Sequence, residues 1–230
     1  AVWLHEYLAA YPGKEDELKY VLTSIAPETK DSEFTWKEYQ TRINSELADI
    51  LGNFVNRALV LTQKYYEGKV PELGTLTEED KAVLAEMQEI PKRISKLIYA
   101  YKLRESQAEA MNMARLGNKY LADQEPWKVI KTDPKRVETI MNIALQITAN
   151  LSIVLQPFLP STAQKLSDFL NFSTTDWNDA GRFDLMKSGD LTNQPEILFQ
   201  KIEDTLVEEE RAKLLKNDST HTKFPPMKEA

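Results

Sequence analysis

The sequence predicts an all-α protein, a bundle of amphipathic helices. Apolar residues recur three and four positions apart along most of the 230 residues, which is the spacing of a helix with one buried face. Only seven glycines occur, too few for a fold rich in strands and tight turns. The chain is long enough to bury a large core, either as one helical domain or as two small ones.

The N-terminal half contains two short helices followed by longer ones. Thr35 is the expected cap of a long helix that closes at Gly68. Thr77 and Asp80 resemble a capping box, with Asp in place of the usual Glu or Gln. Pro91 is expected to kink or split the helix that this box begins. We therefore predict helices over residues 1–11, 15–26, 35–67, 77–101 and 104–123.

The C-terminal half contains the most apolar helix, over residues 134–156, which should lie at the centre of the core. Ser161 is the expected cap of a short helix that ends near residue 170. Residues 171–195 are rich in Ser, Thr, Asn and Asp, which predicts an extended loop. A last amphipathic helix over residues 196–215 should fade into a disordered tail.

Charge and composition limit the partners of the chain. Its net charge of -7 argues against a general nucleic-acid coat, which would be basic throughout. No apolar run approaches about 20 residues, so we expect no membrane span, and we find no signal peptide. The absence of cysteine excludes disulfides and thiolate metal sites and fits a cytoplasmic location. Because the sequence opens mid-helix without Met, we expect it to be a piece of a longer protein.

Trp127 occupies the most informative position. It follows Pro126, and proline disfavours helix at the residue before it but starts a new helix well, so the chain should break near Glu125. A tryptophan at such a break suits stacking on an unpaired base, and burial against another helix is the alternative. The surrounding basic residues predict a phosphate-facing patch, with an ordinary solvated surface as the alternative: Lys119, Lys128, Lys131, Lys135 and Arg136.

Asn53 and Arg57 form the second informative feature. They lie four residues apart on a predicted helix, so their side chains share one face. The amide offers a donor and an acceptor, and the guanidinium offers a rigid donor fork that suits the acceptors N3 and O2 of cytosine. The alternative is that Arg57 pairs with a carboxylate and Asn53 is simply solvated. Gly52 costs about 1 kcal/mol in a helix relative to Ala, which suggests that something packs closely against it.

Residues able to carry catalysis or hold a metal are missing. His5 and His221 are the only histidines and lie far apart in the sequence. The segment at Gly117 and Asn118 is not a phosphate loop, because the upstream glycine is absent. No nucleophile is placed beside a base. We therefore predict no catalytic residues and no metal site in this chain.

Six segments, taken in order, resemble the methionyl-tRNA synthetases downstream of their catalytic core. The resemblance covers nearly the whole chain and is strongest at residues 34–39 (FTWKEY), 44–47 (NSEL), 51–57 (LGNFVNR), 64–71 (KYYEGKVP), 118–128 (NKYLADQEPWK) and 157–160 (PFLP).

The resemblance implies an anticodon-binding helical bundle whose partner is the anticodon loop of methionine tRNA. In the family, a Trp matching Trp127 stacks on the first anticodon base, a cytosine, and an Asn and Arg matching Asn53 and Arg57 read its edge. Ala122 departs from family members that carry a polar residue there. Secondary RNA contacts are predicted at Asn56, Asn118, Lys128 and Lys131.

The resemblance also implies a domain organisation. Residues 1–32 correspond to the connecting helices that follow the catalytic domain, and residues 33–195 correspond to the anticodon-binding domain. Residues 196–216 form the last helix, and residues 217–230 are a predicted disordered linker. The HIGH and KMSKS motifs are absent, so ATP, methionine and a candidate zinc ion would bind in a catalytic domain outside this sequence. The fragment alone is predicted to be inactive.

Two other readings remain open. The first is a related class I synthetase, in which case a different anticodon would be bound. Alternatively, it is a helical module that binds protein, in which case Trp127 would be buried and RNA binding would be absent or insensitive to the anticodon.

Overall fold

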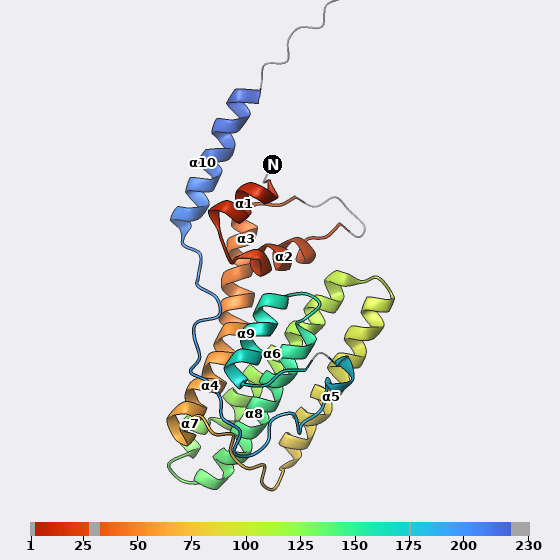
Figure 1. The fold of residues 1–230 in the computed structure, drawn as a ribbon, viewed down its shortest axis with the longest axis vertical. Helices are drawn as coiled ribbons and strands as arrows, with labels where there is room; N and C mark the ends of the chain where they lie inside the picture. Colours follow the sequence, from red (N-terminus) through yellow and green to blue (C-terminus); the bar gives the residue numbers. More distant parts are fainter. Residues whose placement is uncertain (1–2, 28–32, 175, 222–230) are drawn as a thin grey trace, which may run out of the picture.

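Helices dominate the part of the chain that this computed structural model describes, residues 3–27, 33–174 and 176–221, and no sheet is present there. The prediction of an all-α fold is confirmed (Figure 1). In chain order the helices are α1 (Leu4–Ala10), α2 (Glu15–Ser24), α3 (Trp36–Arg42), η1 (Ile43–Gly52), α4 (Asn53–Tyr66), α5 (Glu78–Tyr99), α6 (Leu103–Gln124), α7 (Pro126–Val129), α8 (Pro134–Val154), α9 (Pro160–Leu170), the 3-10 turn η2 (Trp177–Asp179) and α10 (Asp204–His221).

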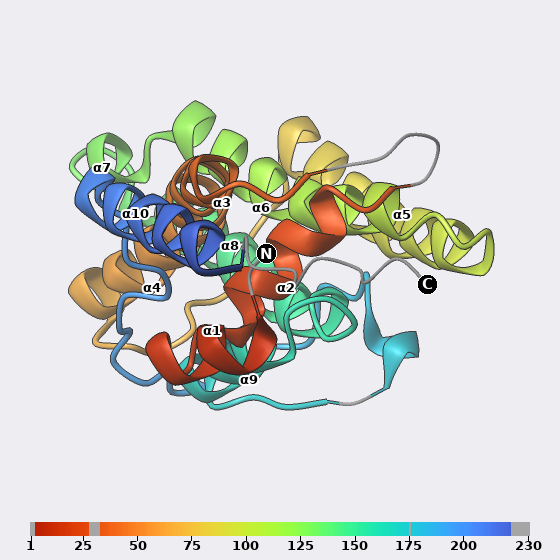
Figure 2. The same cartoon turned by 90° about the horizontal axis from the view of Figure 1, so that it is seen from above.

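Helix α8 is the centre of the core, as its apolar sequence predicts. It packs against α4, α5, α6, α7 and α9 (Figure 2). By length and composition it could cross a membrane, but 94% of its most apolar window is buried inside the protein. Its hydrophobic surface is therefore covered by the other helices of the bundle.

The predicted helix starts and one predicted break can be compared directly with the structure. The hydroxyl of Thr35 accepts a hydrogen bond from the amide of Glu38 at 3.0 Å. At Thr77 both bonds of the predicted capping box form with Asp80. Helix α5 runs through Pro91 without being split, so that part of the expectation was wrong.

The predicted cap of α9 and the predicted opening of the chain were also wrong. Pro160 is the first residue of α9 and Leu159 precedes it, so Ser161 lies inside the helix and is not its cap. Proline suits this position because the first amide of a helix has no partner within the helix. At the other end, Trp3 has an extended conformation and α1 begins at Leu4, so the described chain does not open mid-helix.

The long helix predicted over residues 35–67 changes type in its middle. Residues Ile43–Gly52 form the π-helix η1, and the amide of Asn53 bonds to the carbonyl of Ala48 five residues earlier. The carbonyl of Ile50 accepts a further bond of 2.7 Å from the side chain of Asn118 on α6. This bond joins two helices that are far apart in the sequence. Local helical periodicity contains no sign of such a contact, so it could not reveal the π-helix.

The last helix begins later than predicted. Residues 193–203, here named the return segment, are not helical and run back along α4 and η1 to the start of α3. Asn44 explains this, because its side chain exchanges two hydrogen bonds with the backbone of Ile202, at 2.9 and 2.7 Å. The ring of Phe199 lies 3.8 Å from where a Cβ on Gly52 would be, an ordinary van der Waals distance, so this contact does not by itself require glycine.

Helix α10 returns the chain to its N-terminal end. The hydroxyl of Tyr11, which follows α1, donates to Glu210 on α10 at 2.5 Å, and α10 also packs against α3 (Figure 2). The helix extends to His221, beyond the end predicted at residue 216. Residues 222–230 of the predicted linker lie outside the described part of the chain.

The tryptophans other than Trp127 differ in burial. Trp36 is only 3% exposed and lies in the core. Trp177 is half-buried and donates from its indole nitrogen to the hydroxyl of Ser95 at 2.8 Å. Trp3 is 59% exposed, so it is not part of the core of the described chain.

Candidate nucleic-acid interface

The break before Trp127 forms as predicted. Glu125 ends α6 in the left-handed region, with φ 43° and ψ 54°, and Pro126 then begins α7. The carbonyl of Glu125 accepts the amides of Lys128 and Val129 at 2.8 and 3.1 Å, so the new helical turn is closed at once. Pro126 is buried and fixes the turn in the bundle, while Trp127 is half-buried at the surface.

Arg57 lies against Trp127. The central carbon of its guanidinium is 6.0 Å from the centroid of the indole ring, within the range of a cation–π interaction. No carboxylate within the described residues forms an ion pair with Arg57, so the salt-bridge alternative is not found there. Arg57 therefore lies within reach of Trp127, whose side chain is half-buried.

The three asparagines of the predicted site have different surroundings. Asn53 is the first residue of α4 and is half-buried, whereas Asn56 is exposed. Asn118 already donates to Ile50, and its side-chain oxygen is buried without a hydrogen-bond partner. The donor of Asn118 therefore holds α6 against η1, which sequence reasoning missed.

The basic residues near Trp127 are largely neutralised by their neighbours. Lys128 pairs with Glu125 at 2.6 Å, Lys135 pairs with Glu138 at 2.6 Å, and Lys119 pairs with Asp123. Lys131 is exposed and forms no ion pair with any described residue. The local positive field is consequently weaker than the count of basic residues suggests.

Arg136 does not belong to the predicted phosphate-facing patch. Its guanidinium forms two bonds to the buried carboxylate of Asp80, at 2.5 and 2.7 Å, and a third to Gln124 at 2.7 Å. Asp80 also accepts the hydroxyl of Tyr120 at 2.6 Å. Burial raises the pKa of Asp80, but the bonds from Arg136, Tyr120 and the amide of Thr77 outweigh it and hold the pKa below its ordinary value. The network joins the start of α5, the end of α6 and the start of α8 beside the Trp127 break.

Gly117 allows α6 to approach α4. A Cβ added there would lie 2.7 Å from Cδ2 of Phe54 and closer still to two other carbons of that ring. Phe54 is fully buried, and on α4 it follows Asn53 and precedes Arg57 by three residues. Helix α6, which ends just before the turn that carries Trp127, is thus set against the helix that carries Arg57 by a contact that only glycine permits. A helical glycine flanked by apolar positions is the sequence signal that could have indicated this close approach.

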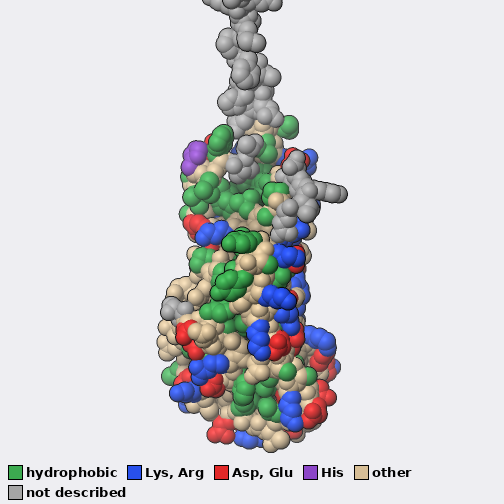
Figure 3. Space-filling model, turned by 90° about the vertical axis from the view of Figure 1, so that its right-hand side faces the viewer, with side chains coloured by type: hydrophobic (Ala, Val, Ile, Leu, Met, Phe, Trp, Pro, Cys, Tyr) green, Lys and Arg blue, Asp and Glu red, His purple; other side chains and the backbone are tan. Residues whose placement is uncertain are grey.

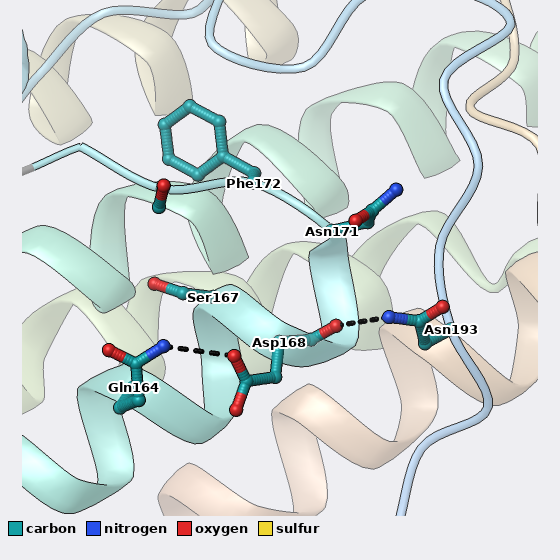
Figure 4. Close-up of a pocket in the computed structure, with 7 residues that line it drawn as sticks. Gln164, Ser167, Asp168, Asn171, Phe172 and Asn193 are labelled. Carbon is teal, nitrogen blue, oxygen red and sulfur yellow. Dashed lines mark hydrogen bonds between the residues drawn. The ribbon is translucent and has the colours of Figure 1, made fainter.

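A second concave surface lies at the end of α9 (Figure 4). Its volume is about 460 Å³, and its lining is mainly polar, with Gln164, Ser167, Asp168, Asn171, Phe172, Ser173 and Asn193. Gln164 donates to the Asp168 carboxylate at 2.9 Å, and Asn193 donates to the Asp168 carbonyl at 2.5 Å. Since no lysine or arginine lines this pocket, it is poorly suited to a nucleic-acid backbone. Its bonds hold the return segment to α9.

Two family models match the sequence. The anticodon binding domain of methionyl tRNA ligase matches residues 70–218, and the class I tRNA synthetases (M) match residues 1–59. Residues 60–69 lie between the two matches. Asn53 and Arg57 fall in one match and Trp127 in the other.

Full-length relatives and solved structures agree with these matches. The methionine–tRNA ligase of Bacteroides fragilis (strain YCH46) is 53% identical over 99% of this chain and 34% of its own length. That of Parabacteroides distasonis is 54% identical over 100% of this chain and 34% of its own length. The apo methionyl-tRNA synthetase of Mycobacterium tuberculosis superposes with a TM-score of 0.74 at 25% identity, over 82% of this chain and 39% of that one. The chain thus spans about a third of the length of these curated relatives.

Proposed function

Because this chain belongs to the methionyl-tRNA synthetase family and spans its anticodon-binding domain, we propose that Trp127, Arg57 and Asn53 read the first anticodon base of methionine tRNA. The single observation that supports this proposal best is the position of the Arg57 guanidinium 6.0 Å from the centre of the Trp127 ring. It brings a flat aromatic surface and a donor fork together from two helices that are far apart in sequence.

The separation of these two groups suggests how a base would enter. A base between two planar groups needs a stacking distance of about 3.5 Å on each side, or about 7 Å in total. The present 6.0 Å is about 1 Å short of this, so Arg57 must shift before a base can lie flat on that face of Trp127. Arg57 is exposed and on a flexible stem, so the shift requires no change in the fold. The guanidinium then reaches the edge of the base.

Cytosine suits the groups that would surround its edge. Arg57 can donate to the cytosine acceptors N3 and O2, and Asn53 supplies one donor and one acceptor beside it. A purine or a uracil presents a different pattern, which leaves a donor or an acceptor of the site without a partner. Such a mismatch costs about 1–3 kcal/mol in a desolvated site, which is enough to discriminate between bases.

Anticodon stem-loops that differ only in the first anticodon base test this proposal. The stem-loop with cytosine should bind most tightly, and Arg57→Ala should reduce its advantage over the other three bases. Trp127→Ala should weaken binding of the cytosine stem-loop by about 1–3 kcal/mol, the contribution of base–aromatic stacking. Trp3→Ala is the matched control, because Trp3 is an exposed tryptophan outside the proposed site, immediately before α1.

Equal affinity for all four stem-loops would contradict the proposal. Tighter binding of a non-methionine anticodon would favour the related-synthetase reading instead. No binding at all, together with a protein partner that protects Trp127, would favour the interaction-module reading. Acrylamide quenching of tryptophan fluorescence, with and without RNA, separates the last two outcomes when wild type is compared with Trp127→Phe.

The proposed secondary contacts differ in how available they are. Asn56 and Lys131 are exposed and can meet the RNA directly. Lys128 must first leave Glu125, and the amide donor of Asn118 is already bonded to Ile50. Substituting Lys131 should therefore weaken stem-loop binding more than substituting Lys128.

We also propose that the whole protein is a methionine–tRNA ligase of the cytoplasm. The catalytic part would bind ATP and methionine, with zinc as a further candidate, and would share methionine tRNA with the present chain. The described residues hold no group of three side chains suited to a metal ion. An assay of methionine attachment to tRNA tests whether catalysis belongs to the other part of the protein, since the 230-residue chain alone should show no activity.

A further inference from the structure

The end of the α5–α6 hairpin carries two unusually exposed tyrosines. Tyr99 is 85% exposed and Tyr101 is 90% exposed, and Leu103 beside them is 52% exposed. Hydrophobic, basic and acidic side chains are interspersed on the side of the molecule where this hairpin lies (Figure 3). From residue 90 to residue 104 the sequence contains five basic residues and no acid, but Lys92, Arg93 and Lys102 pair with glutamates outside this run.

Tyr101 has a backbone conformation that glycine usually adopts. Its φ is 58°, and it closes α5 with bonds from its amide to Ile98 and from the amide of Lys102 to Leu97, both at 2.9 Å. This pattern is a Schellman motif, which favours glycine at the left-handed position. A side chain there is strained, and this one packs into no core. Strain at an exposed aromatic residue is consistent with a binding role.

A pocket of about 350 Å³ lies between α2, α3, η1 and α6, with Arg42, Arg104 and Arg115 in its lining. Its one carboxylate, Glu46, accepts the hydroxyl of Tyr20 and also bonds to Arg42. Arg115 bonds to the neutral amide oxygen of Asn112 at 3.0 Å, so this bond leaves its charge unneutralised. Arginine forks in a concave surface are well suited to phosphate oxygens.

Helix α6 connects this surface to the proposed anticodon site. Its 22 residues span about 33 Å, with Arg104 near the start and Trp127 just beyond the end. Arg104, Ala108, Arg115 and Lys119 are exposed along it at helical spacing, so they share one face. That length corresponds to roughly twelve base pairs of A-form RNA at about 2.8 Å each, so one folded RNA can reach both ends.

We propose that Tyr99, Tyr101, Lys102, Arg104 and Arg115, here named the hairpin surface, form a second RNA-binding site that contacts tRNA outside its anticodon loop. The arginines and Lys102 would bind backbone phosphates, and the tyrosines would stack on an unpaired base or a ribose. RNA is favoured over a protein partner by the arginine-lined pocket and by the exposed basic face of α6 that leads from it toward Trp127. This inference rests on the proposed function, because both sites would bind the same molecule.

The test compares full-length methionine tRNA with its isolated anticodon stem-loop. An A-form stem of about five base pairs extends only about 14 Å, so the stem-loop should not reach Arg104 from Trp127. The double variant Arg104→Gln/Arg115→Gln should bind full-length tRNA roughly tenfold more weakly, and the slope of log affinity against log salt should fall by about two. Its preference for cytosine in the first anticodon position should not change. The double variant Tyr99→Ala/Tyr101→Gly should also bind full-length tRNA more weakly, while melting no lower than wild type.

Lys165→Glu is the matched control, because it alters an exposed basic residue on α9. Hairpin variants that bind full-length tRNA like wild type, with an unchanged salt slope, would overturn the inference. An equal loss in the Lys165 variant would also overturn it, since the effect would then be one of net charge. A wild-type chain that self-associates and becomes monomeric in the tyrosine variant would assign the surface to a second copy instead. Failure of the proposed function looks different, since wild type would then show no preference among anticodon bases.

Discussion

Replacing Gly117 with alanine should destabilise the bundle and separate the two halves of the proposed anticodon site. The new methyl group would lie inside van der Waals contact with the ring of Phe54, at 2.7 Å from Cδ2 and closer to its neighbours. Phe54 is fully buried, so its ring has no free space into which it can turn. Helix α6 must therefore move away from α4, and Trp127 would move away from Arg57.

Two effects of opposite sign decide the magnitude. Alanine is better than glycine inside a helix by about 1 kcal/mol, which would stabilise the variant. Forcing an extra methyl group into a packed core costs about 1–3 kcal/mol, and contacts this short favour the upper part of that range. We therefore expect the free energy of unfolding to fall by about 1–2 kcal/mol.

Urea unfolding measured by circular dichroism provides the assay. The midpoint should fall while the slope stays the same, because the surface exposed on unfolding does not change. Phe54→Leu removes part of the obstructing ring and costs about 1 kcal/mol or more by itself. The Phe54→Leu/Gly117→Ala protein should be more stable than the sum of the two single effects predicts, because the residues are in contact.

Stem-loop binding completes this experiment. Gly117→Ala should weaken binding of the cytosine stem-loop, and the double variant should recover part of the loss. The reasoning would be refuted by a Gly117→Ala protein that is as stable as wild type or more stable. It would equally be refuted by a double variant whose stability is the simple sum of the two changes.

Three further predictions concern other parts of the fold. Asp80→Asn should lower the free energy of unfolding by about 3–5 kcal/mol, because it leaves the Arg136 guanidinium without its buried carboxylate partner. Because the pKa of Asp80 is lowered in the folded state, its contribution is present above the unfolded pKa of about 4 and is lost as the pH falls through the folded value. Wild-type stability should therefore drop below about pH 4, and the loss should be smaller in Asp80→Asn, as measured by urea midpoints across pH. Tyr101→Gly should raise the free energy of unfolding by about 1 kcal/mol by relieving the left-handed strain, and an unchanged melting temperature would contradict this. Asn44→Ala should release the return segment, so the amide of Ile202 should exchange with solvent faster while amides in α8 keep their protection.

Local signals predicted the parts of the fold that depend on neighbouring residues. The caps at Thr35 and Thr77 and the break before Pro126 each involve groups within four residues, and all three form as expected. The central helix α8 was also predictable, because an almost continuous apolar surface can be covered only inside a bundle.

Features that depend on distant residues could not be predicted in the same way. The π-helix is associated with the bond from Asn118 to Ile50, which joins residues 68 positions apart. The return segment is fixed by Asn44 and Ile202, which are 158 positions apart. Helical periodicity contains no information about such pairs, so it predicted a continuous α-helix and an early start for α10.

Arg136 shows why the predicted phosphate-facing patch was also mistaken in part. Counting charges along the sequence treats every basic residue as available, but its guanidinium is bonded to Asp80, 56 positions away. An arginine paired with a buried carboxylate is not available to bind a ligand, because separating the pair would leave a buried charge unpaired. The sequence shows both residues, but their pairing emerges only from the packing of α5 against α8.

The distribution of charge suggests that affinity and specificity arise at different places on this molecule. Around Trp127 most lysines are paired with acids, so few phosphate contacts are available there and stacking and edge recognition must provide most of the binding. Such interactions depend little on salt and strongly on the identity of the base. At the hairpin surface Lys102 is likewise paired, with Glu105 at 3.2 Å, and the arginines would supply phosphate contacts, which are salt-dependent and carry no direct sequence information. If both proposals hold, stem-loop binding should be selective and nearly independent of salt, and binding of full-length tRNA should add affinity without adding base selectivity.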